Sequence, residues 1–86
     1  MSTTRIQHEP AAHRFTAWVE AQAAGELDYE LAQGSVVFTH TGVRPELRGT
    51  GIAAELVEAG LRWAREQGLA VVPACSYVAA YLRRLE

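Results

Sequence analysis

The sequence predicts an α/β fold with a mixed, mostly antiparallel sheet of about five strands, one long helix after the fourth strand and a short C-terminal helix. Three observations predict it. Apolar and polar residues tend to alternate through residues 1–34, as in strands with one buried face. Between residues 51 and 67, apolar residues recur at spacings of three and four, as on one side of a helix. A short apolar run at 69–72 and a second amphipathic stretch at 77–84 complete the pattern.

The N-terminal half is predicted to form a meander of three strands, with a further strand if residues 4–8 pair with it. Leu27, Tyr29 and Leu31 alternate with acidic residues, which places these three side chains on the core face. The last strand of the meander is rich in β-branched and aromatic residues, which favour strands. The three strands are predicted at residues 14–20, 27–31 and 35–41, and the first two are joined through residues 21–25.

The second half begins with the long helix, predicted over residues 51–67. Gly68 stands where a left-handed C-terminal cap is expected. The apolar run 69–72 is predicted to be a buried strand, and it ends at Pro73 because proline cannot donate a hydrogen bond within a sheet.

The final helix is predicted over residues 77–84, with Ser76 as its N-cap. Its apolar residues share one face. Arg83 and Arg84 lie in its last turn, where positive charge is favourable because of the helix dipole.

Length and composition limit the function. The 86 residues fit one domain, residues 1–86, and 49% hydrophobic with 21% charged residues is typical of a globular protein. A net charge of −2, with eight arginines in no dense cluster, argues against nucleic-acid binding. No apolar stretch is long enough to cross a membrane and the first residues lack the apolar core of a secretory signal, so we expect a cytoplasmic protein. The terminal Leu85-Glu86 is either native or left by expression cloning.

A glycine-rich turn joins the predicted strand 35–41 to the long helix. The first N–H groups of a helix have no internal partner and lie at the positive end of its dipole, so they can bind an anion. Gly49 and Gly51 would let the main chain approach a phosphate closely, and Arg48 can add a charged contact. The pattern therefore indicates a phosphate-binding turn, although an ordinary turn before a helix is the alternative.

The segment 43–53 reads VRPELRGTGIA, which resembles motif A of the GCN5-related N-acetyltransferases. The segments HTGV at 40–43 and PACSYVAAY at 73–81 are similar to a minimal single-domain subgroup of that family with a cysteine after the fifth strand. The resemblance implies that the loop amides hold the pyrophosphate of acetyl-CoA and that the preceding strand pairs with the pantetheine arm. The implied cofactor-binding residues are Thr41, Val43, Arg48, Gly49, Thr50, Gly51, Ile52 and Ala53.

Three residues are candidates for catalysis, each with a structural alternative. Cys75 lies at the entry to the final helix, where the dipole favours a thiolate nucleophile, or it is a small buried residue. His40, at the end of a strand, can accept a proton from an amine or be structural. The resemblance suggests that Tyr81 protonates the departing CoA, although a packing role is the stronger interpretation. Three other aromatic residues, Trp18, Trp63 and Tyr77, are predicted to be core or interface residues, and His8 and His13 are predicted to be surface residues. The three histidines and the cysteine lack the spacing of metal ligands, so no metal site is predicted.

These observations and the resemblance predict an acetyl-CoA-dependent N-acetyltransferase that acts on an amine of a small molecule or peptide. Transfer proceeds either by direct attack with His40 as base, or through an acetylated Cys75. The alternative is a non-catalytic module that binds acyl-CoA and senses it or regulates a partner. A structural interaction domain without a cofactor is the third class. The chain is expected to be a monomer or a weak homodimer.

Overall fold

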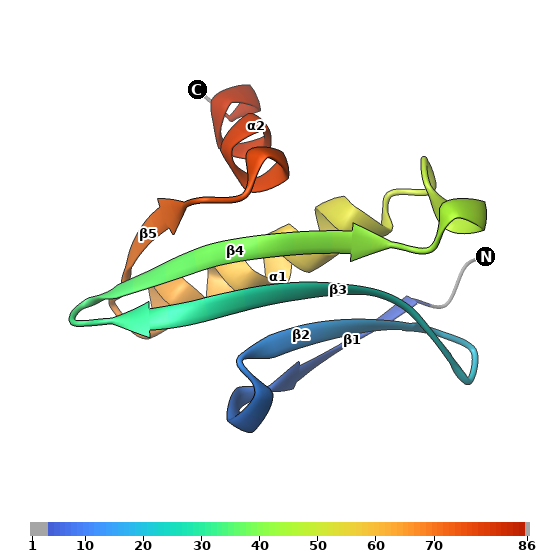
Figure 1. Cartoon of the computed structure of the whole chain (residues 1–86), viewed down its shortest axis with the longest axis horizontal. Coiled ribbons are helices and arrows are strands. Elements are labelled where there is room, and N and C mark those ends of the chain that lie inside the picture. Colours follow the sequence, from blue (N-terminus) through green and yellow to red (C-terminus); the bar gives the residue numbers. More distant parts are fainter. Residues whose placement is uncertain (1–3, 86) are drawn as a thin grey trace.

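A computed structural model describes residues 4–85, so Glu86 of the terminal dipeptide lies outside the described residues. Five strands form one sheet in chain order, antiparallel from β1 to β4 and parallel between β4 and β5 (Figure 1). The predicted fold class, with a long helix after the fourth strand and a short C-terminal helix, is confirmed. The elements are β1 (Thr4–Glu9), β2 (Arg14–Val19), β3 (Gln22–Ala32), β4 (Ser35–Val43), α1 (Ile52–Glu66), β5 (Ala70–Pro73) and α2 (Ser76–Arg84), with short 3₁₀ turns at Pro10–Ala12 and Pro45–Leu47.

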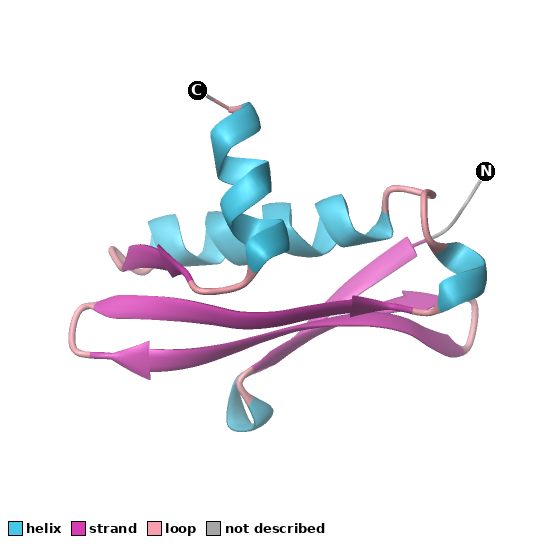
Figure 2. Ribbon diagram, turned by 45° about the horizontal axis from the view of Figure 1, so that its top comes forward, coloured by secondary structure: helices cyan, strands magenta, loops and turns pink. Residues whose placement is uncertain are grey.

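The hydrophobic core lies between the sheet and α1, which crosses all five strands on one side. Leu27 and Phe38 of the sheet and Leu56 of α1 are completely buried there. Val78 of α2 joins the same core, so α2 is packed beside α1 at the β4–β5 edge (Figure 2). In the part of the chain that the structure describes, no α-helix covers the opposite face of the sheet, which we call the open face.

An aromatic cluster closes the core at the β1–β2 end. His8 stacks on Phe15 at a centroid distance of 4.1 Å, and its Nε2 lies 2.7 Å from the hydroxyl of Tyr29. Trp63 packs edge-on against His8. His8, predicted to be a surface residue, is instead partly buried, because aromatic side chains from three elements pack against it, and this burial lowers its pKa. His13, also expected at the surface, is half-buried against Tyr29.

Two strand predictions need correction at the start and end of β3. The segment 21–25 was predicted to connect two strands, but β3 begins at Gln22 because the chain turns tightly at Glu20, where φ is +57°. A register shift after Ala17 then leaves Ala24 buried. Leu31, predicted on the core face, is 50% exposed because it lies at the β3–β4 hairpin end of the sheet.

Two predictions near the C-terminus also differ from the structure. The strand predicted to be buried is β5, an edge strand in which only Val71 is half-buried and Val72 is 42% exposed. Ser76 is not the N-cap of α2. Cys75 is the N-cap, because its backbone is still extended, with φ −91° and ψ 134°, and Ser76 is the first helical residue.

A β-bulge in β4 determines which side chains face the functional region. Asp28 pairs with His40 and Tyr29 pairs with Phe38, so Thr39 is an extra residue in β4. Before the bulge, even-numbered residues such as Phe38 face α1. After it, the odd-numbered Thr41 faces α1, opposite buried Leu27, and His40 faces the open side.

The same region is where β4 and β5 diverge. Their parallel pairing runs from Ser35 to Phe38 on β4 and ends at Pro73 on β5. The last backbone contact is the N–H of Cys75, which donates to the carbonyl oxygen of Phe38 at 2.9 Å. Beyond it, β4 continues to Val43, and none of the strands described within residues 4–85 lies beside this edge (Figure 1).

Candidate functional site

A cleft of about 520 Å³ opens where β4 has left β5. Its walls are the end of β4, the loop into α1, the first turn of α1, and α2. The lining residues are Thr41, Gly42, Val43, Leu47, Arg48, Gly49, Gly51, Ile52, Ala53, Ala54, Tyr77 and Arg84. Seven of the eight predicted cofactor-binding residues are thus brought together at one cleft. The eighth, Thr50, is not among the lining residues, and its hydroxyl donates to the carbonyl oxygen of Leu47 at 2.6 Å.

The loop that leads into the N-terminus of α1 has a backbone conformation suited to binding an anion. Gly51 is the N-cap of α1 with φ +90°, a conformation that residues with a side chain rarely adopt. Among the residues that the structure describes, no side chain caps this helix end, so the N–H groups of its first turn are available to a ligand. A Cβ at Gly51 would have no atom within 4 Å, which shows that the space beside the loop is open. These features fit a phosphate held by main-chain amides.

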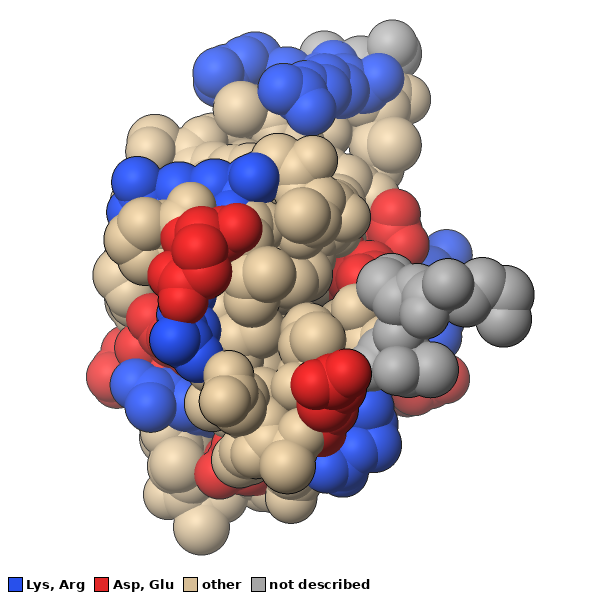
Figure 3. All heavy atoms as spheres, turned by 90° about the vertical axis from the view of Figure 1, so that its right-hand side faces the viewer, with Lys and Arg blue, Asp and Glu red and all other residues tan. Residues whose placement is uncertain are grey.

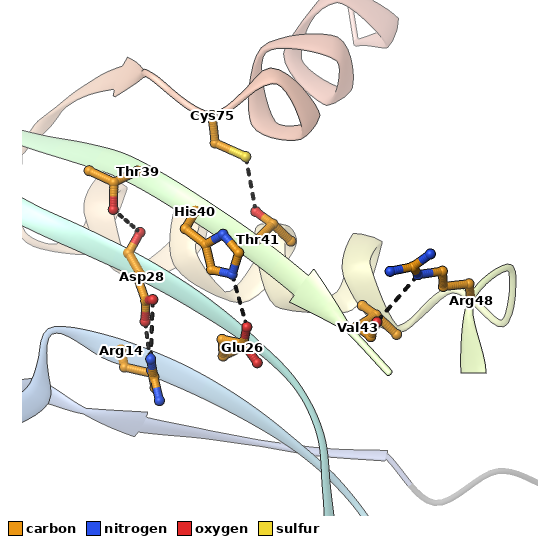
Figure 4. A network of polar contacts seen from close by, with 9 residues as sticks. All are labelled: Arg14, Glu26, Asp28, Thr39, His40, Thr41, Val43, Arg48 and Cys75. Atoms are coloured by element: carbon orange, nitrogen blue, oxygen red, sulfur yellow. Dashed lines mark hydrogen bonds and ion pairs between the residues drawn. The ribbon is translucent and has the colours of Figure 1, made fainter. Parts of the chain in front are cut away.

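The outer edge of β4 forms a second wall. A strand edge without a neighbouring strand presents backbone groups that can pair with an extended ligand. Near the end of β4, Nε of Arg48 lies 3.4 Å from the carbonyl oxygen of Val43, which brings the guanidinium to the cleft (Figure 4). The cleft therefore combines a helix end that is suited to an anion with a strand edge that is suited to a linear arm.

Cys75 lies beside the inner end of this edge. Its Sγ is 3.4 Å from Oγ1 of Thr41, a residue that lines the cleft (Figure 4). Burial alone raises the pKa of Cys75, but the Thr41 hydroxyl and the backbone N–H groups of Val78 and Tyr77 stabilise the thiolate more, so the pKa is lowered. The side chain of Cys75 makes no capping hydrogen bond to the first turn of α2. The N–H groups of Tyr77 and Val78 therefore act on the sulphur as nearby partial positive charges.

His40 and Tyr81, the other predicted catalytic residues, lie outside the cleft lining. His40 is on the open face, with its Nε2 3.0 Å from Oε2 of Glu26. Tyr81 donates its hydroxyl to Oε1 of Glu58 on α1 at 2.8 Å. Burial, followed by this carboxylate, raises the pKa of Tyr81. The cleft-lining tyrosine of α2 is instead Tyr77, which was predicted to be a core or interface residue.

Sequence reasoning missed five lining residues: Gly42, Leu47, Ala54, Tyr77 and Arg84. Tyr77 and Arg84 are seven residues apart, which places them on the same face of a helix two turns apart. That spacing was a usable signal. Figure 3 views the molecule from the side where β4 ends, and shows arginine side chains at the end of α2 and others lower down, separated by uncharged surface. Arg84 and Arg48 thus add positive charge to two different walls of the cleft.

Two properties of residues 4–85 bear on other functions. They contain no group of three or more His, Cys, Asp or Glu side chains that could hold a metal ion. No helix in this described range is both long and apolar enough to cross a membrane.

Comparison with known proteins gives a consistent result. A family model described as GCN5-related N-acetyl-transferase matches residues 14–86. The solution NMR structure of a GCN5-like protein from Staphylococcus aureus superimposes with a TM-score of 0.74, at 29% identity over 98% of this chain and 82% of that chain. A comparison with curated proteins found no significant match.

Two larger enzymes share the fold at lower identity. An aminoglycoside N-acetyltransferase in complex with CoA aligns with a TM-score of 0.62 and 22% identity, over 84% of this chain and 54% of that chain. An aminoglycoside acetyltransferase from an uncultured soil metagenomic sample, in complex with sisomicin, gives 0.64 and 20%, over 83% and 54%. This chain therefore spans about half the length of these two enzymes. Because the family model covers most of the sequence and the fold agrees, the chain belongs to the GCN5-related N-acetyltransferase family.

Proposed function

We propose that the protein is an acetyl-CoA-dependent N-acetyltransferase that transfers an acetyl group to a primary amine. The single observation that carries the proposal is the cleft itself, in which an uncapped helix N-terminus is followed by an unpaired strand edge, with Cys75 in contact with the lining residue Thr41 at the inner end of that edge. This order suits a molecule with a phosphate group at one end and a thioester at the other.

The residues present fit acetyl-CoA as the donor substrate. The amides from Gly49 to Ala53 would hold the pyrophosphate, because they are free at the positive end of α1. The edge of β4 from Thr41 to Val43 would pair with the amide groups of the pantetheine arm. When bound, acetyl-CoA supplies an activated acyl group. The protein's part is to orient that group beside Thr41 and Cys75 and to receive the proton of the acceptor.

We infer that the acceptor is an amine of a small molecule or peptide. The two larger relatives with this fold are named as aminoglycoside acetyltransferases, and one of them contains sisomicin. The present chain has the open face next to the end of β4, and no α-helix in its described part encloses an acceptor there. An open acceptor side suits a flexible amine better than a small, enclosed metabolite.

Two measurements test the proposal. Thermal unfolding with CoA or acetyl-CoA measures binding, because a ligand that binds only the folded state raises Tm. Release of free thiol from acetyl-CoA in the presence of spermidine, an N-terminally unblocked peptide or sisomicin then measures transfer. Binding with transfer supports the enzyme. Binding without transfer to any amine supports the alternative, a non-catalytic acyl-CoA-binding module, and absence of binding contradicts both.

The arginines of the cleft give a graded prediction. We expect Arg48→Ala and Arg84→Ala each to weaken CoA binding by about 0.5–1 kcal/mol, roughly two- to fivefold in Kd, the scale of an exposed ion pair. The loss should shrink at high salt, since exposed charges are screened. Arg83→Ala is the matched control, because Arg83 is the neighbour of Arg84 but does not line the cleft. Isothermal titration at two ionic strengths measures this, and a salt-independent loss would mean that the arginine acts through packing.

A further inference from the structure

We propose that Glu26 positions His40 as the proton acceptor for the incoming amine, and that the acceptor approaches from the open face of the sheet. This inference rests on the proposed acetyl transfer. It adds a residue, Glu26, that the sequence analysis did not single out, and a direction of approach.

The two side chains form a pair across neighbouring strands. Nε2 of His40 on β4 lies 3.0 Å from Oε2 of Glu26 on β3, and both point out of the open face (Figure 4). Their side chains remain 57% and 34% exposed, so a ligand can reach them. A carboxylate can only accept a hydrogen bond, so Nε2 of a neutral His40 must carry the hydrogen. Nδ1 then keeps its lone pair and can take up a proton.

Gly42 makes this pair possible. It lies directly opposite Glu26 in the sheet and two residues after His40, on the same face. A Cβ at position 42 would overlap the carboxylate of Glu26 and come within 3.0 Å of Nε2 of His40. Gly42 also lines the cleft. The cleft and the pair are therefore separated by the backbone of a residue that has no side chain.

The edge of β4 connects the two faces of the sheet. Its pairing with β5 ends at Phe38, before His40 is reached. Because of the bulge at Thr39, the adjacent residues His40 and Thr41 face opposite ways. Thr41 faces the cleft, and His40 faces the open side of the sheet. A thioester that lies along this edge near Thr41 can thus be approached from the open face, past His40.

Acetyl transfer removes two protons from the acceptor nitrogen. The ammonium group of the acceptor gives one proton to Nδ1 of His40, and the free nitrogen lone pair forms a bond to the acetyl carbonyl carbon. The C–S bond breaks, its electron pair goes to the sulphur of CoA, and that sulphur takes up the second proton released by the nitrogen. His40 returns its proton to solvent. If the acetyl group is first carried by Cys75, the same step holds with the sulphur of Cys75 as the leaving atom.

The first test separates positioning from binding. His40→Ala should lower kcat by about 100-fold, the lower range for loss of a general base, and leave the Kd for CoA unchanged. Glu26→Gln should also lower kcat without changing the KM for acetyl-CoA, because the amide can donate to Nε2 and allow the hydrogen to move to Nδ1. Glu30→Gln is the matched control, since Glu30 is exposed on the same face of β3 but pairs with Val37 instead.

The second test is chemical rescue, with thiol release measured for the best acceptor among spermidine, the unblocked peptide and sisomicin. Free imidazole should restore turnover of His40→Ala, and it should restore the double variant with Glu26→Gln equally well, because free imidazole needs no positioning residue. Turnover by the parent with unchanged kcat in His40→Ala and Glu26→Gln overturns this inference alone. No turnover by the parent with any acceptor, despite CoA binding, overturns the proposed function and this inference with it.

Discussion

Replacing Gly51 with valine is expected to weaken CoA binding by about 1–3 kcal/mol, roughly five- to 150-fold in Kd, the scale of losing hydrogen bonds to a charged group. Gly51 caps α1 with φ +90°, and the space beside it is open, so a phosphate could approach the main chain there. A valine side chain would occupy that space, and its β-branched side chain disfavours the positive φ. Isothermal titration with CoA measures the loss.

The control has to separate backbone strain from obstruction of the ligand. Gly34, in the β3–β4 hairpin, also has a positive φ, +74°, and also has open space where a Cβ would lie. It does not line the cleft. Gly34→Val should therefore lower Tm in the same way while leaving CoA affinity intact. If Gly51→Val folds and binds CoA like the parent, the loop does not hold a phosphate. Gly51→Ala tests the same point with a smaller side chain and should weaken CoA binding less.

Local features of the sequence predicted most of the fold and the glycine-rich loop that lines the cleft. The alternation in the meander and the three-and-four spacing of α1 depend on which side chains face one core, so they are visible in the chain itself. The segment 43–53 likewise lies within one strand–loop–helix unit, and the structure brings its ends to one cleft. Elements whose determinants are adjacent in sequence were thus accessible to prediction.

The remaining features depend on contacts between distant segments. The bulge at Thr39 reverses which residues of β4 face α1, and alternation within one strand does not reveal it. Glu26 and His40 are 14 residues apart and meet only because β3 and β4 pair in this register. His8 becomes partly buried because Phe15, Tyr29 and Trp63 converge on it from other elements. Such side-chain partners follow from the register of the sheet, which a single sequence does not specify fully.

Cys75 has the surroundings of a reactive thiol. It precedes the first turn of α2, and the Thr41 hydroxyl lies 3.4 Å from its sulphur. These groups lower the pKa of Cys75 despite its burial, so a larger fraction is thiolate at neutral pH. Thr41 also lines the cleft, which brings the sulphur to the region where the thioester would end. If the acetyl group passes through Cys75, the Cys75 thiolate would bond to the acetyl carbon while the C–S bond to CoA breaks, and CoA would leave as a thiolate that takes up a proton from solvent.

We expect alkylation of Cys75 to be fast in the free protein and to slow by up to about 100-fold at a CoA concentration of 100 Kd, where about 1% of the protein is unliganded. Thr41→Val should shift the pH dependence of alkylation to higher pH, because losing the hydroxyl that stabilises the thiolate raises the pKa of Cys75. Thr39→Val, on the exposed bulge, is the matched control and should behave like the parent.

Mass spectrometry after incubation with acetyl-CoA shows whether Cys75 carries an acetyl group. If the parent protein forms this adduct, the Cys75→Ala variant should lose transfer almost completely. Slow alkylation that ignores CoA, together with full transfer by Cys75→Ala, would make Cys75 a packing residue and leave direct attack by the amine as the route.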